Sequence, residues 1–305
     1  MNEINQKTLV SPVKFNGIGL HSGQKSEITI NPAKENEGII FKRIDLKQNN
    51  IIEANFKNVS SAKLCTTLEN KHGAKVSTVE HLLAALYITG IDNAFVEINC
   101  EEVPIMDGSS KDFLTVLTEV NLINQAKKRK YLKISDKIEL VDGEKKISIE
   151  PHNSLEVDFQ LKYENKIIGK QKNIIDFQND DLKDVSSSRT FCLFEDIEFI
   201  KKNGLAKGGS LDNAIVVKDK EILNKDGLRN DKEFVNHKIL DCIGDLYTSG
   251  YRIIGNVMCS QGGHYLTNQL LRKVFLDKNN FSIIEIREKN LPHTLINRNL
   301  LRSIA

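Results

Sequence analysis

Two helical segments, each preceded by short strand-like segments, place the strongest constraint on what this chain can fold into. The first contains the residues STVEH at positions 77–81, and the second contains HKILD at positions 237–241. Apolar residues recur at helical spacing in both segments. Because strands precede a helix in each half of the chain, we expect an α+β fold of two related domains. Each domain should be a β-sheet layered against helices, with a binding site between the two halves.

The second helical segment has recognisable ends. We predict a helix from Phe234 to Ser249, with Asn230 as its N-cap, Glu233 three positions later and Gly250 at its end. At about 100° per residue, one stripe of this helix is apolar. That stripe consists of Val235, Ile239, Ile243 and Leu246.

A second stripe of the same helix is polar. His237, Asp241 and Asp245 are spaced i, i+4 and i+8, so they lie on one side of the helix. His237 and Asp241 are one turn apart and are able to bind one metal ion together. A solvated helix face that happens to carry a His–Asp pair explains the same spacing, so this segment alone does not decide between the two.

The first helical segment supplies the complementary groups. We predict a helix over residues 78–89, with Ser77 and Glu80 as a capping box and Gly90 at its end. His81 lies opposite the apolar stripe, so it is not expected to be a packed core residue. The simplest interpretation of Glu80 is that it is the partner in the capping box. Together the two helices offer two imidazoles, a ligand carboxylate and a spare carboxylate, which is what a hydrolytic zinc site requires. The apolar stripe consists of Val79, Leu82, Leu83 and Leu86.

Composition narrows the class of protein. With 305 residues the chain is long enough for two ordinary domains, and a formal net charge of +2 argues against nucleic-acid binding by bulk electrostatics. No signal-peptide pattern and no run of roughly 18 uncharged apolar residues is visible. Five cysteines without CxxC spacing suit free thiols in a reducing compartment, so we expect a cytoplasmic protein. They are Cys65, Cys100, Cys192, Cys242 and Cys259.

We divide the chain into an N-terminal α+β domain (1–125), a C-terminal α+β domain (131–280) and a C-terminal extension (281–305) that includes a helical part, Leu295–Ile304. The basic polar run Asn124–Lys130 is interpreted as a linker, and Ser110 should cap a helix from Lys111 to Leu122. The predicted strands are Ser26–Asn31, Gly38–Lys42, Asn93–Asn99, Tyr131–Ile134, Lys137–Val141, Lys146–Glu150, Leu155–Tyr163, Ala214–Val217 and Ile253–Met258.

Three loops deserve a functional interpretation. The glycines of GIGLHSG at 17–23 are not followed by a dinucleotide-binding helix. We therefore expect them to allow a tight turn or the close approach of a ligand. His21 would then either contact that ligand or be an ordinary loop residue. The amphipathic run Ile197–Lys202 and the glycine-rich loop 204–210 can frame an apolar channel or a plain βαβ unit. His264 follows two glycines after a strand, a position typical of a loop-borne acid–base group.

Seven ordered motifs link these features. They are GIGLHSG (17–23), VSTVEHLLAAL (76–86), GIDNAFVEIN with EVPIMDGS (90–109), SRTF (188–191), GLAKGGSLDNAIVV (204–217), NKDGLRNDKEFVNHKILDCIGDL (224–246) and GGH (262–264). With these motifs, which span most of residues 7–275, the chain resembles the bacterial zinc-dependent UDP-3-O-acyl-N-acetylglucosamine deacetylases of the committed step of lipid A synthesis. The resemblance implies helices facing one another across an active site between the domains. It also implies a second-domain insert at about 190–217 that forms a hydrophobic passage for an acyl chain.

The resemblance also implies site residues. The zinc ligands would be His81, His237 and Asp241, a set that accepts Fe²⁺ as well. Glu80 would be the general base, and His264 the acid and partner of the oxyanion.

Further roles follow from the same resemblance. Thr190 would donate to the oxyanion, Asp245 would orient His264, and Lys238 would meet the substrate's phosphates. The remaining substrate contacts would be Phe191, Leu205 and Ala214 at the passage, Tyr163 against uracil, and His21. Cys65, in a loop before the Glu80 helix, is interpreted as an inert thiol, and Leu193 stands where relatives can have an aromatic residue.

We therefore expect an amidohydrolase that releases acetate from UDP-3-O-(3-hydroxyacyl)-N-acetylglucosamine. It should act as a monomer, with no nucleic-acid partner and no stable membrane anchor, in transient contact with the inner membrane. The alternative is a non-catalytic nucleotide-sugar or acyl-binding protein with structural zinc in a closed four-ligand shell. A zinc peptidase is set aside, because the His–Glu order at residues 80–81 does not fit its motif.

Overall fold

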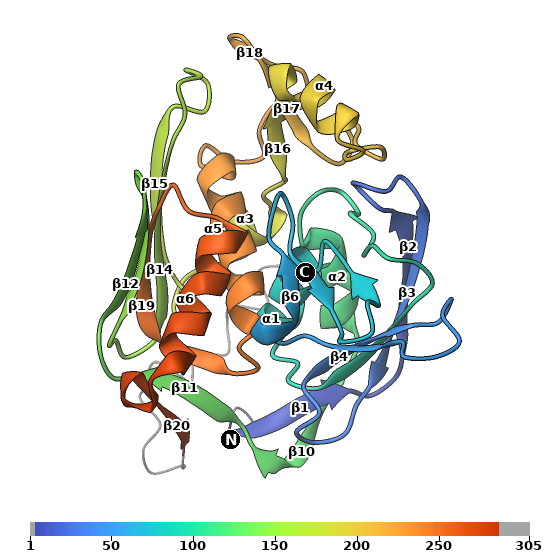
Figure 1. Cartoon of the computed structure of the whole chain (residues 1–305), viewed down its shortest axis with the longest axis vertical. Helices are drawn as coiled ribbons and strands as arrows, with labels where there is room; N and C mark the ends of the chain where they lie inside the picture. Colours follow the sequence, from blue (N-terminus) through green and yellow to red (C-terminus); the bar gives the residue numbers. More distant parts are fainter. Residues whose placement is uncertain (1–3, 287–305) are drawn as a thin grey trace.

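The computed structural model describes residues 4–286 and shows a mixed α+β protein in which several sheets pack against helices (Figure 1). The predicted α+β class is confirmed. The predicted helix Leu295–Ile304 lies outside the described residues. Among the residues that the structure describes, no helix is both long enough and apolar enough to cross a bilayer.

The first half of the chain forms a five-stranded sheet that packs on helices α1 (Glu80–Thr89) and α2 (Lys111–Glu119). Its side chains alternate between buried and exposed along the strands, as expected for a sheet with one covered face. Phe15 of the sheet meets Phe113 of α2 edge to face, with ring centroids 5.0 Å apart. In spatial order the strands are β2 (Val13–Ile18), β3 (Lys25–Pro32), β9 (Ala94–Ile98), β4 (Ile39–Arg43) and β5 (Ile51–Glu53).

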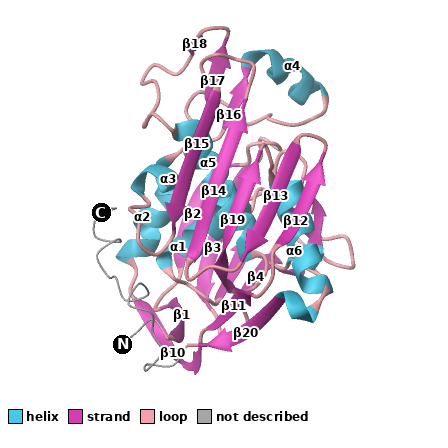
Figure 2. Ribbon diagram, turned by 90° about the vertical axis from the view of Figure 1, so that its left-hand side faces the viewer, coloured by secondary structure: helices cyan, strands magenta, loops and turns pink. Residues whose placement is uncertain are grey.

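The second half forms a seven-stranded sheet whose inner face is covered by α5 (Glu233–Tyr247) and α6 (His264–Leu276). Figures 1 and 2 show these helices lying along one face of the sheet. The central strand β19 (Arg252–Ser260) pairs with three neighbours. The other strands are β11 (Lys130–Ile134), β12 (Ile138–Asp142), β13 (Lys145–Glu150), β14 (Leu155–Lys162), β15 (Lys170–Asp176) and β20 (Phe281–Glu285).

Two segments at the junction of the halves differ from the sequence prediction. The supposed linker Asn124–Lys130 is wrong, because most of it belongs to strand β10 (Leu122–Lys128), which pairs antiparallel with β1 (Asn5–Leu9). Residues 281–285, which we placed in a C-terminal extension, form β20 and pair with β11. In both cases the pairing partner is remote in sequence, so no local pattern reveals it.

A small insert projects from the second half at the top of Figure 1. It consists of β16 (Phe191–Leu193), α4 (Phe194–Lys202), β17 (Ile215–Lys218) and β18 (Glu221–Ile222). The remaining short elements are η1 (Phe56–Asn58), β6 (Val59–Ser61), β7 (Thr67–Glu69), β8 (Lys75–Val76), α3 (Lys183–Ser187) and η2 (Lys278–Asn280).

The helix starts also differ from the prediction. Ser77 lies in a β-bridge with Glu102, so Ser77 and Glu80 do not form a capping box, although Gly90 ends α1 as expected, in a left-handed conformation. Helix α5 begins at Glu233, one residue before the predicted Phe234, but its N-cap is Lys232 and not Asn230. The side chain of Ser110 makes no cap at α2, since its hydroxyl donates instead to the carbonyl oxygen of His81 at 2.7 Å.

Candidate metal and active site

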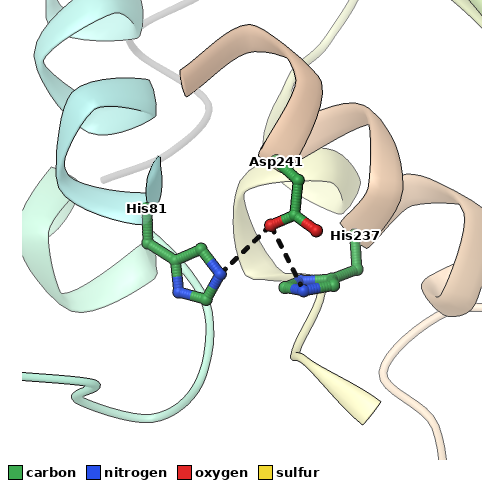
Figure 3. A group of neighbouring side chains, drawn as sticks. All are labelled: His81, His237 and Asp241. Carbon is green, nitrogen blue, oxygen red and sulfur yellow. Dashed lines mark ion pairs between the residues drawn. The ribbon is translucent and has the colours of Figure 1, made fainter. Parts of the chain in front are cut away.

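Helices α1 and α5, one from each half of the chain, cross at very close range. Gly244 makes the approach possible, because a β-carbon at that position would lie 2.0 Å from the carbonyl oxygen of Glu80. The close crossing brings His81 on α1 next to His237 and Asp241 on α5, as Figure 3 shows. The sequence placed these residues on helices but gave no signal for the glycine contact.

The two histidines converge on one carboxylate oxygen. His81 Nε2 lies 3.3 Å and His237 Nε2 lies 3.4 Å from Asp241 Oδ1. One ligand atom from each residue lies within 4.8 Å of the other two, and all three side chains are buried. The interpretation of the His237–Asp241 stripe as a solvated helix face is therefore wrong.

The chemistry of these three groups fits a divalent metal ion. His237 Nδ1 lies 3.1 Å from the carbonyl oxygen of Ser188, which leaves Nε2 with its lone pair toward the site. Burial lowers the pKa of His237 to about 3, so its imidazole is neutral, as a ligand must be. Asp241 Oδ1 is buried and has no hydrogen-bond partner among residues 4–286, which is the environment of a carboxylate oxygen prepared for a cation.

The second oxygen of Asp241 is already engaged. Lys238 Nζ lies 2.6 Å from Asp241 Oδ2, with both side chains largely buried. Burial alone would raise the pKa of Asp241, but the positive charge of neighbouring groups, Lys238 above all, holds it well below its ordinary value. The carboxylate is therefore ionised at neutral pH, with Oδ1 left for a metal.

An acid–base pair lies beside the ligand group. Glu80, the residue before His81, is buried, and burial raises the pKa of its carboxyl group. His264 Nδ1 lies 2.8 Å from Asp245 Oδ2, and its Nε2 lies 3.9 Å from Glu80 Oε1. Burial alone would lower the pKa of His264, but the carboxylates, Asp245 first, raise it to about 9. His264 is thus a cation at neutral pH, and it begins helix α6, where we had expected a loop.

A cavity of about 390 Å³ gives access to these groups. Glu80, the three potential ligands, Lys238 and His264 line it, together with Thr190 and Tyr163. Asp245 lies behind His264 and is not among the lining residues. Every polar residue that we expected to bind the metal or to take part in catalysis therefore lines this cavity or contacts a residue that lines it.

An apolar cavity of about 400 Å³ adjoins the first and shares His21, Thr190 and Phe191 with it. The insert supplies most of its wall. Ala214 lines it as expected, but Ala206 takes the place of its neighbour Leu205 in the wall. Further apolar lining comes from Leu20, Phe194, Ile197, Ile200, Val216 and Leu223.

Aromatic rings lie where the two cavities meet. The ring of Phe191 packs edge to face on Tyr163 at 5.8 Å and on Phe234 at 5.0 Å, between ring centroids. It also lies 6.2 Å from the imidazole of His237. The structure thus brings Tyr163 and Phe191 together at the edge of the metal-ligand group.

The glycine loop at 17–23 closes the wall from the first half of the chain. Gly208 N donates to the carbonyl oxygen of Leu20 at 3.0 Å, so the loop is bound to the insert. Buried Glu102, which sequence reasoning missed, holds the loop by accepting from the backbone N–H groups of His21 and Ser22 at 2.8 and 2.7 Å. Within the part of the chain that the structure describes, both ring nitrogens of His21 are buried without a hydrogen-bond partner.

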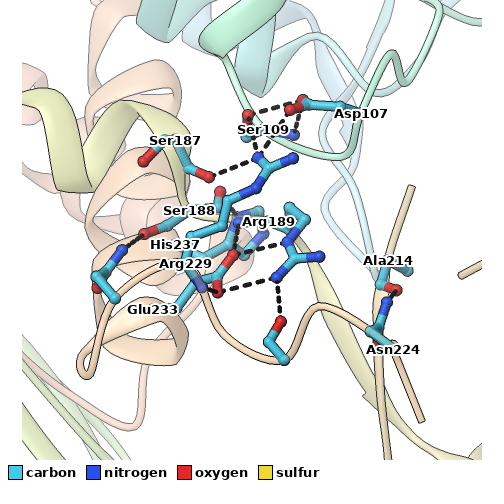
Figure 4. Close-up of polar contacts among 12 residues, drawn as sticks. Asp107, Ser109, Ser187, Ser188, Arg189, Ala214, Asn224, Arg229, Glu233 and His237 are labelled. Carbon is cyan, nitrogen blue, oxygen red and sulfur yellow. Dashed lines mark hydrogen bonds and ion pairs between the residues drawn. The ribbon is translucent and has the colours of Figure 1, made fainter. Parts of the chain in front are cut away.

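Thr190 is held by its backbone at the start of the insert. Its N–H donates to Gly108 O, and its carbonyl accepts from Ile215 N, both at 2.8 Å. The preceding Arg189 is buried and binds Glu233 through Nε at 2.8 Å (Figure 4). Because Glu233 begins the helix that carries His237, this ion pair fixes Thr190 relative to the ligand group.

A second arginine ties the same region to the first half of the chain. Arg229 Nη1 lies 2.7 Å from Asp107 Oδ2 and 2.8 Å from Ser187 O (Figure 4). The backbone N–H of Arg229 also donates to Glu233. These contacts join loops far apart in sequence, which is why periodicity gave no hint of them.

Cys65 lies outside the ligand group that the described residues form. Its thiol is buried and contacts Thr67 Oγ1 at 3.9 Å. Burial raises the pKa of this thiol to about 12, so it is protonated at neutral pH. A protonated thiol neither reacts nor binds metal readily.

Comparison with known proteins agrees with this geometry. A family model described as UDP-3-O-acyl N-acetylglycosamine deacetylase matches residues 6–276. A UDP-3-O-acyl-N-acetylglucosamine deacetylase of Pasteurella multocida is 42% identical over 294 residues, covering 95% of this chain and 96% of the relative. Relatives with the same description from Idiomarina loihiensis (42%; 94% of each chain) and Aliivibrio fischeri (43%; 90% of this chain and 91% of the relative) match over nearly the same length.

Proposed function

Since the chain belongs to the UDP-3-O-acyl N-acetylglycosamine deacetylase family, we propose the roles that its own residues take in the family's reaction. The protein is a hydrolase that deacetylates an acylated UDP-N-acetylglucosamine in lipid A biosynthesis. The alternative of a non-catalytic binding protein with structural zinc is therefore set aside. What remains to be assigned is the metal, the proton transfers and the substrate contacts.

His81, His237 and Asp241 would hold one zinc ion through two imidazole nitrogens and one carboxylate oxygen. When bound, zinc supplies Lewis acidity, which polarises a carbonyl group and makes water a stronger acid. The same three ligands accept Fe²⁺. The unpartnered Oδ1 of Asp241 and the neutral imidazole of His237 support this assignment.

Glu80 and His264 lie where the two proton transfers of amide hydrolysis need a base and an acid. As general base, the Glu80 carboxylate takes a proton from the attacking water while the C–O bond forms. As general acid, the His264 imidazolium gives its Nε2 proton to the nitrogen of the departing amine when the C–N bond breaks. Asp245 holds Nδ1 of His264, and so keeps Nε2 directed into the cavity.

Thr190 stabilises the oxyanion that forms on the substrate. Thr190 lines both cavities, and its backbone is fixed on both sides by hydrogen bonds. A donor carried on a fixed backbone needs less reorganisation as charge develops on the oxygen. The cationic His264 adds favourable charge at the same place.

The two cavities divide the substrate between them. We propose that the acyl chain occupies the apolar cavity, with Phe191 and Ala214 in contact, and that the sugar lies in the polar one near His21. Tyr163 would stack on uracil. Lys238, which lines the polar cavity, would attract the phosphates in addition to its contact with Asp241. Leu205 was expected in the same wall, but Ala206 is the better candidate for contact with the chain.

The architecture is consistent with two domains of related layout, each a sheet with helices on one face, and with the active site between them. We propose a first domain that ends after β10, at about residue 128, and a second domain that runs from about residue 130 through β20, with the insert at about 190–217 as the acyl passage. All five cysteines are free thiols, which supports a cytoplasmic location. We also propose a monomer that meets the membrane only transiently.

The observation that carries this mechanism is the pairing of a buried carboxyl group, that of Glu80, with a cationic histidine, His264, beside the ligand group. The test is acetate release from the acylated UDP-sugar, with and without a chelator, combined with a metal assay. Glu80→Ala should retain zinc and lose at least about 100-fold in kcat. Glu119→Ala, at an exposed position of α2, is the matched control and should behave as wild type. Near-normal turnover of Glu80→Ala would remove Glu80 from its role.

A further inference from the structure

Thr66 touches both carboxyl groups of the acid–base pair. It is buried and lies immediately before strand β7. Its backbone N–H donates to Glu80 Oε2 at 3.0 Å, and its hydroxyl donates to Asp245 Oδ1 at 2.5 Å. Asp245 is on α5, so one residue of a short hairpin connects groups from both halves of the chain.

The remaining oxygen of each carboxyl group faces His264. Asp245 Oδ2 lies 2.8 Å from Nδ1, and Glu80 Oε1 lies 3.9 Å from Nε2. The contacts therefore form a closed ring, from Thr66 to Glu80, to His264, to Asp245 and back to Thr66. In this ring each carboxyl group has one oxygen bound to Thr66 and the other directed at the imidazole.

A carboxyl group that is free to rotate presents either oxygen to its neighbour, whereas one that is bound through one oxygen presents only the other. The Thr66 carbonyl also accepts from Val79 N at 3.4 Å, just before α1 begins, so the backbone of Thr66 is itself fixed against that helix. Thr66 thus provides two oriented donors from one rigid position.

We propose that Thr66 is a positioning residue for the deacetylation, which orients Glu80 and Asp245 so that both act on His264. This inference rests on the proposed roles of Glu80 and His264. Thr66 does not line the cavity that contains them, so it acts through these neighbours and not on the substrate.

The experiment compares variants of the zinc-loaded enzyme. Thr66→Val removes the hydroxyl but keeps the branched shape of the side chain and the backbone N–H. Thr66→Ala removes both the hydroxyl and the branch, whereas Thr66→Ser keeps the hydroxyl and loses only the methyl group. Thr67→Val is the matched control, because it makes the same change at the next residue of the chain, whose hydroxyl contacts only the Cys65 thiol in the described structure. For each variant we would measure kcat, KM, zinc content and the proton NMR signal of His264 Nδ1–H.

Thr66→Val and Thr66→Ala should lose about 10- to 100-fold in kcat, the usual effect of removing such an outer partner. KM and zinc content should stay within about twofold, and the Nδ1–H signal should shift. Thr66→Ser should recover most of the rate, and Thr67→Val should match wild type. The Ala variant keeps the test decisive if the Val variant does not fold.

Two outcomes would overturn the inference. One is a normal kcat in the Val or Ala variant; the other is a Ser variant as slow as the Ala variant, which would mean that the hydroxyl is not the active feature. Glu80→Ala and His264→Ala distinguish the levels of failure. If these two are slow and Thr66→Ala is not, only the role of Thr66 fails, whereas if all three are fast, the proposed mechanism fails with it.

Discussion

Gly244 and Glu80 are in contact through their backbones, so closely that a β-carbon on Gly244 would lie 2.0 Å from the Glu80 carbonyl oxygen. The contact joins the C-terminal part of α5 to the first turn of α1. It therefore sets how far His81 lies from His237 and Asp241. Since Glu80 itself is the proposed base, one glycine controls both the ligand group and the base.

Gly244→Ala should damage both features. In most helices this change stabilises the protein by up to about 1 kcal/mol, because alanine has the higher helix propensity. Here it should lower the free energy of unfolding, weaken zinc binding and reduce kcat/KM at least about tenfold. A tenfold loss requires only about 1.4 kcal/mol less stabilisation of the transition state, which a small displacement of the catalytic groups causes. Denaturant unfolding, metal titration and acetate release measure the three effects. A more stable, fully active variant would contradict the account.

The rate should depend on pH in a bell shape. His264 must be protonated to act as an acid, and its pKa is raised to about 9, so kcat/KM should fall as the pH rises through about 9. Glu80 must be ionised to act as a base, and burial raises its pKa. The rate should therefore also fall as the pH is lowered, and this acidic limb should lie at a higher pH than the ordinary pKa of a glutamate.

Asp245→Asn tests the cause of the basic limb. The carboxylate of Asp245 is the main group that raises the pKa of His264, so its neutralisation should lower that pKa and move the basic limb to lower pH. The measurement is a profile of kcat/KM against pH at constant zinc concentration and ionic strength. A basic limb that stays in place would show that another group titrates there.

Glu233→Gln should be strongly destabilising. Glu233 is fully buried against Arg189, and its loss leaves a buried guanidinium without its charge partner. The cost should be about 3 to 5 kcal/mol in the free energy of unfolding. Glu150→Gln is the control, because the pair Lys137–Glu150 is exposed and should contribute less than about 1 kcal/mol. Equal costs in the two variants would refute the assigned importance of the buried pair.

Ala214→Phe should narrow the apolar cavity, because Ala214 lines it. The added ring fills space that a long acyl chain would occupy. We expect KM to rise at least about tenfold for a long-chain substrate and to change little for a short-chain analogue. A tenfold rise corresponds to the binding energy of one or two methylene groups that lose their contacts. Leu205→Phe is the control, because Leu205 lies outside the wall. If chain length made no difference to the effect of Ala214→Phe, the acyl chain would have to lie elsewhere.

The spacing of residues in the sequence indicated the candidate metal-ligand group, although it did not by itself exclude a solvated helix face. His237 and Asp241 were found from their i, i+4 spacing, and Gly90 was identified as a helix end, because both signals are local. The position of His264 after two glycines indicated an acid–base group, but its specific role, and that of Thr190, came through family resemblance, since each is a single residue beside a glycine loop or a strand. Their local sequence does not distinguish them from ordinary loop residues.

Other features depend on contacts that have no local signal. Glu80 looked like a capping partner, but its carboxyl group accepts from Thr66 of a separate hairpin. Likewise, Glu102 was missed because its function is to accept from backbone N–H groups of a loop about 80 residues earlier. Such contacts are set by tertiary packing, which periodicity does not encode.

The pairing of β1 with β10 has a consequence for synthesis of the protein. On the ribosome, Asn5–Leu9 is made long before Leu122–Lys128, which is its strand partner in the described structure. Until that second strand appears, the nascent chain carries the unpaired N–H and C=O groups of β1 as an edge open to other chains. A fragment cut before Leu122 would keep that open edge permanently and should aggregate where the intact chain does not.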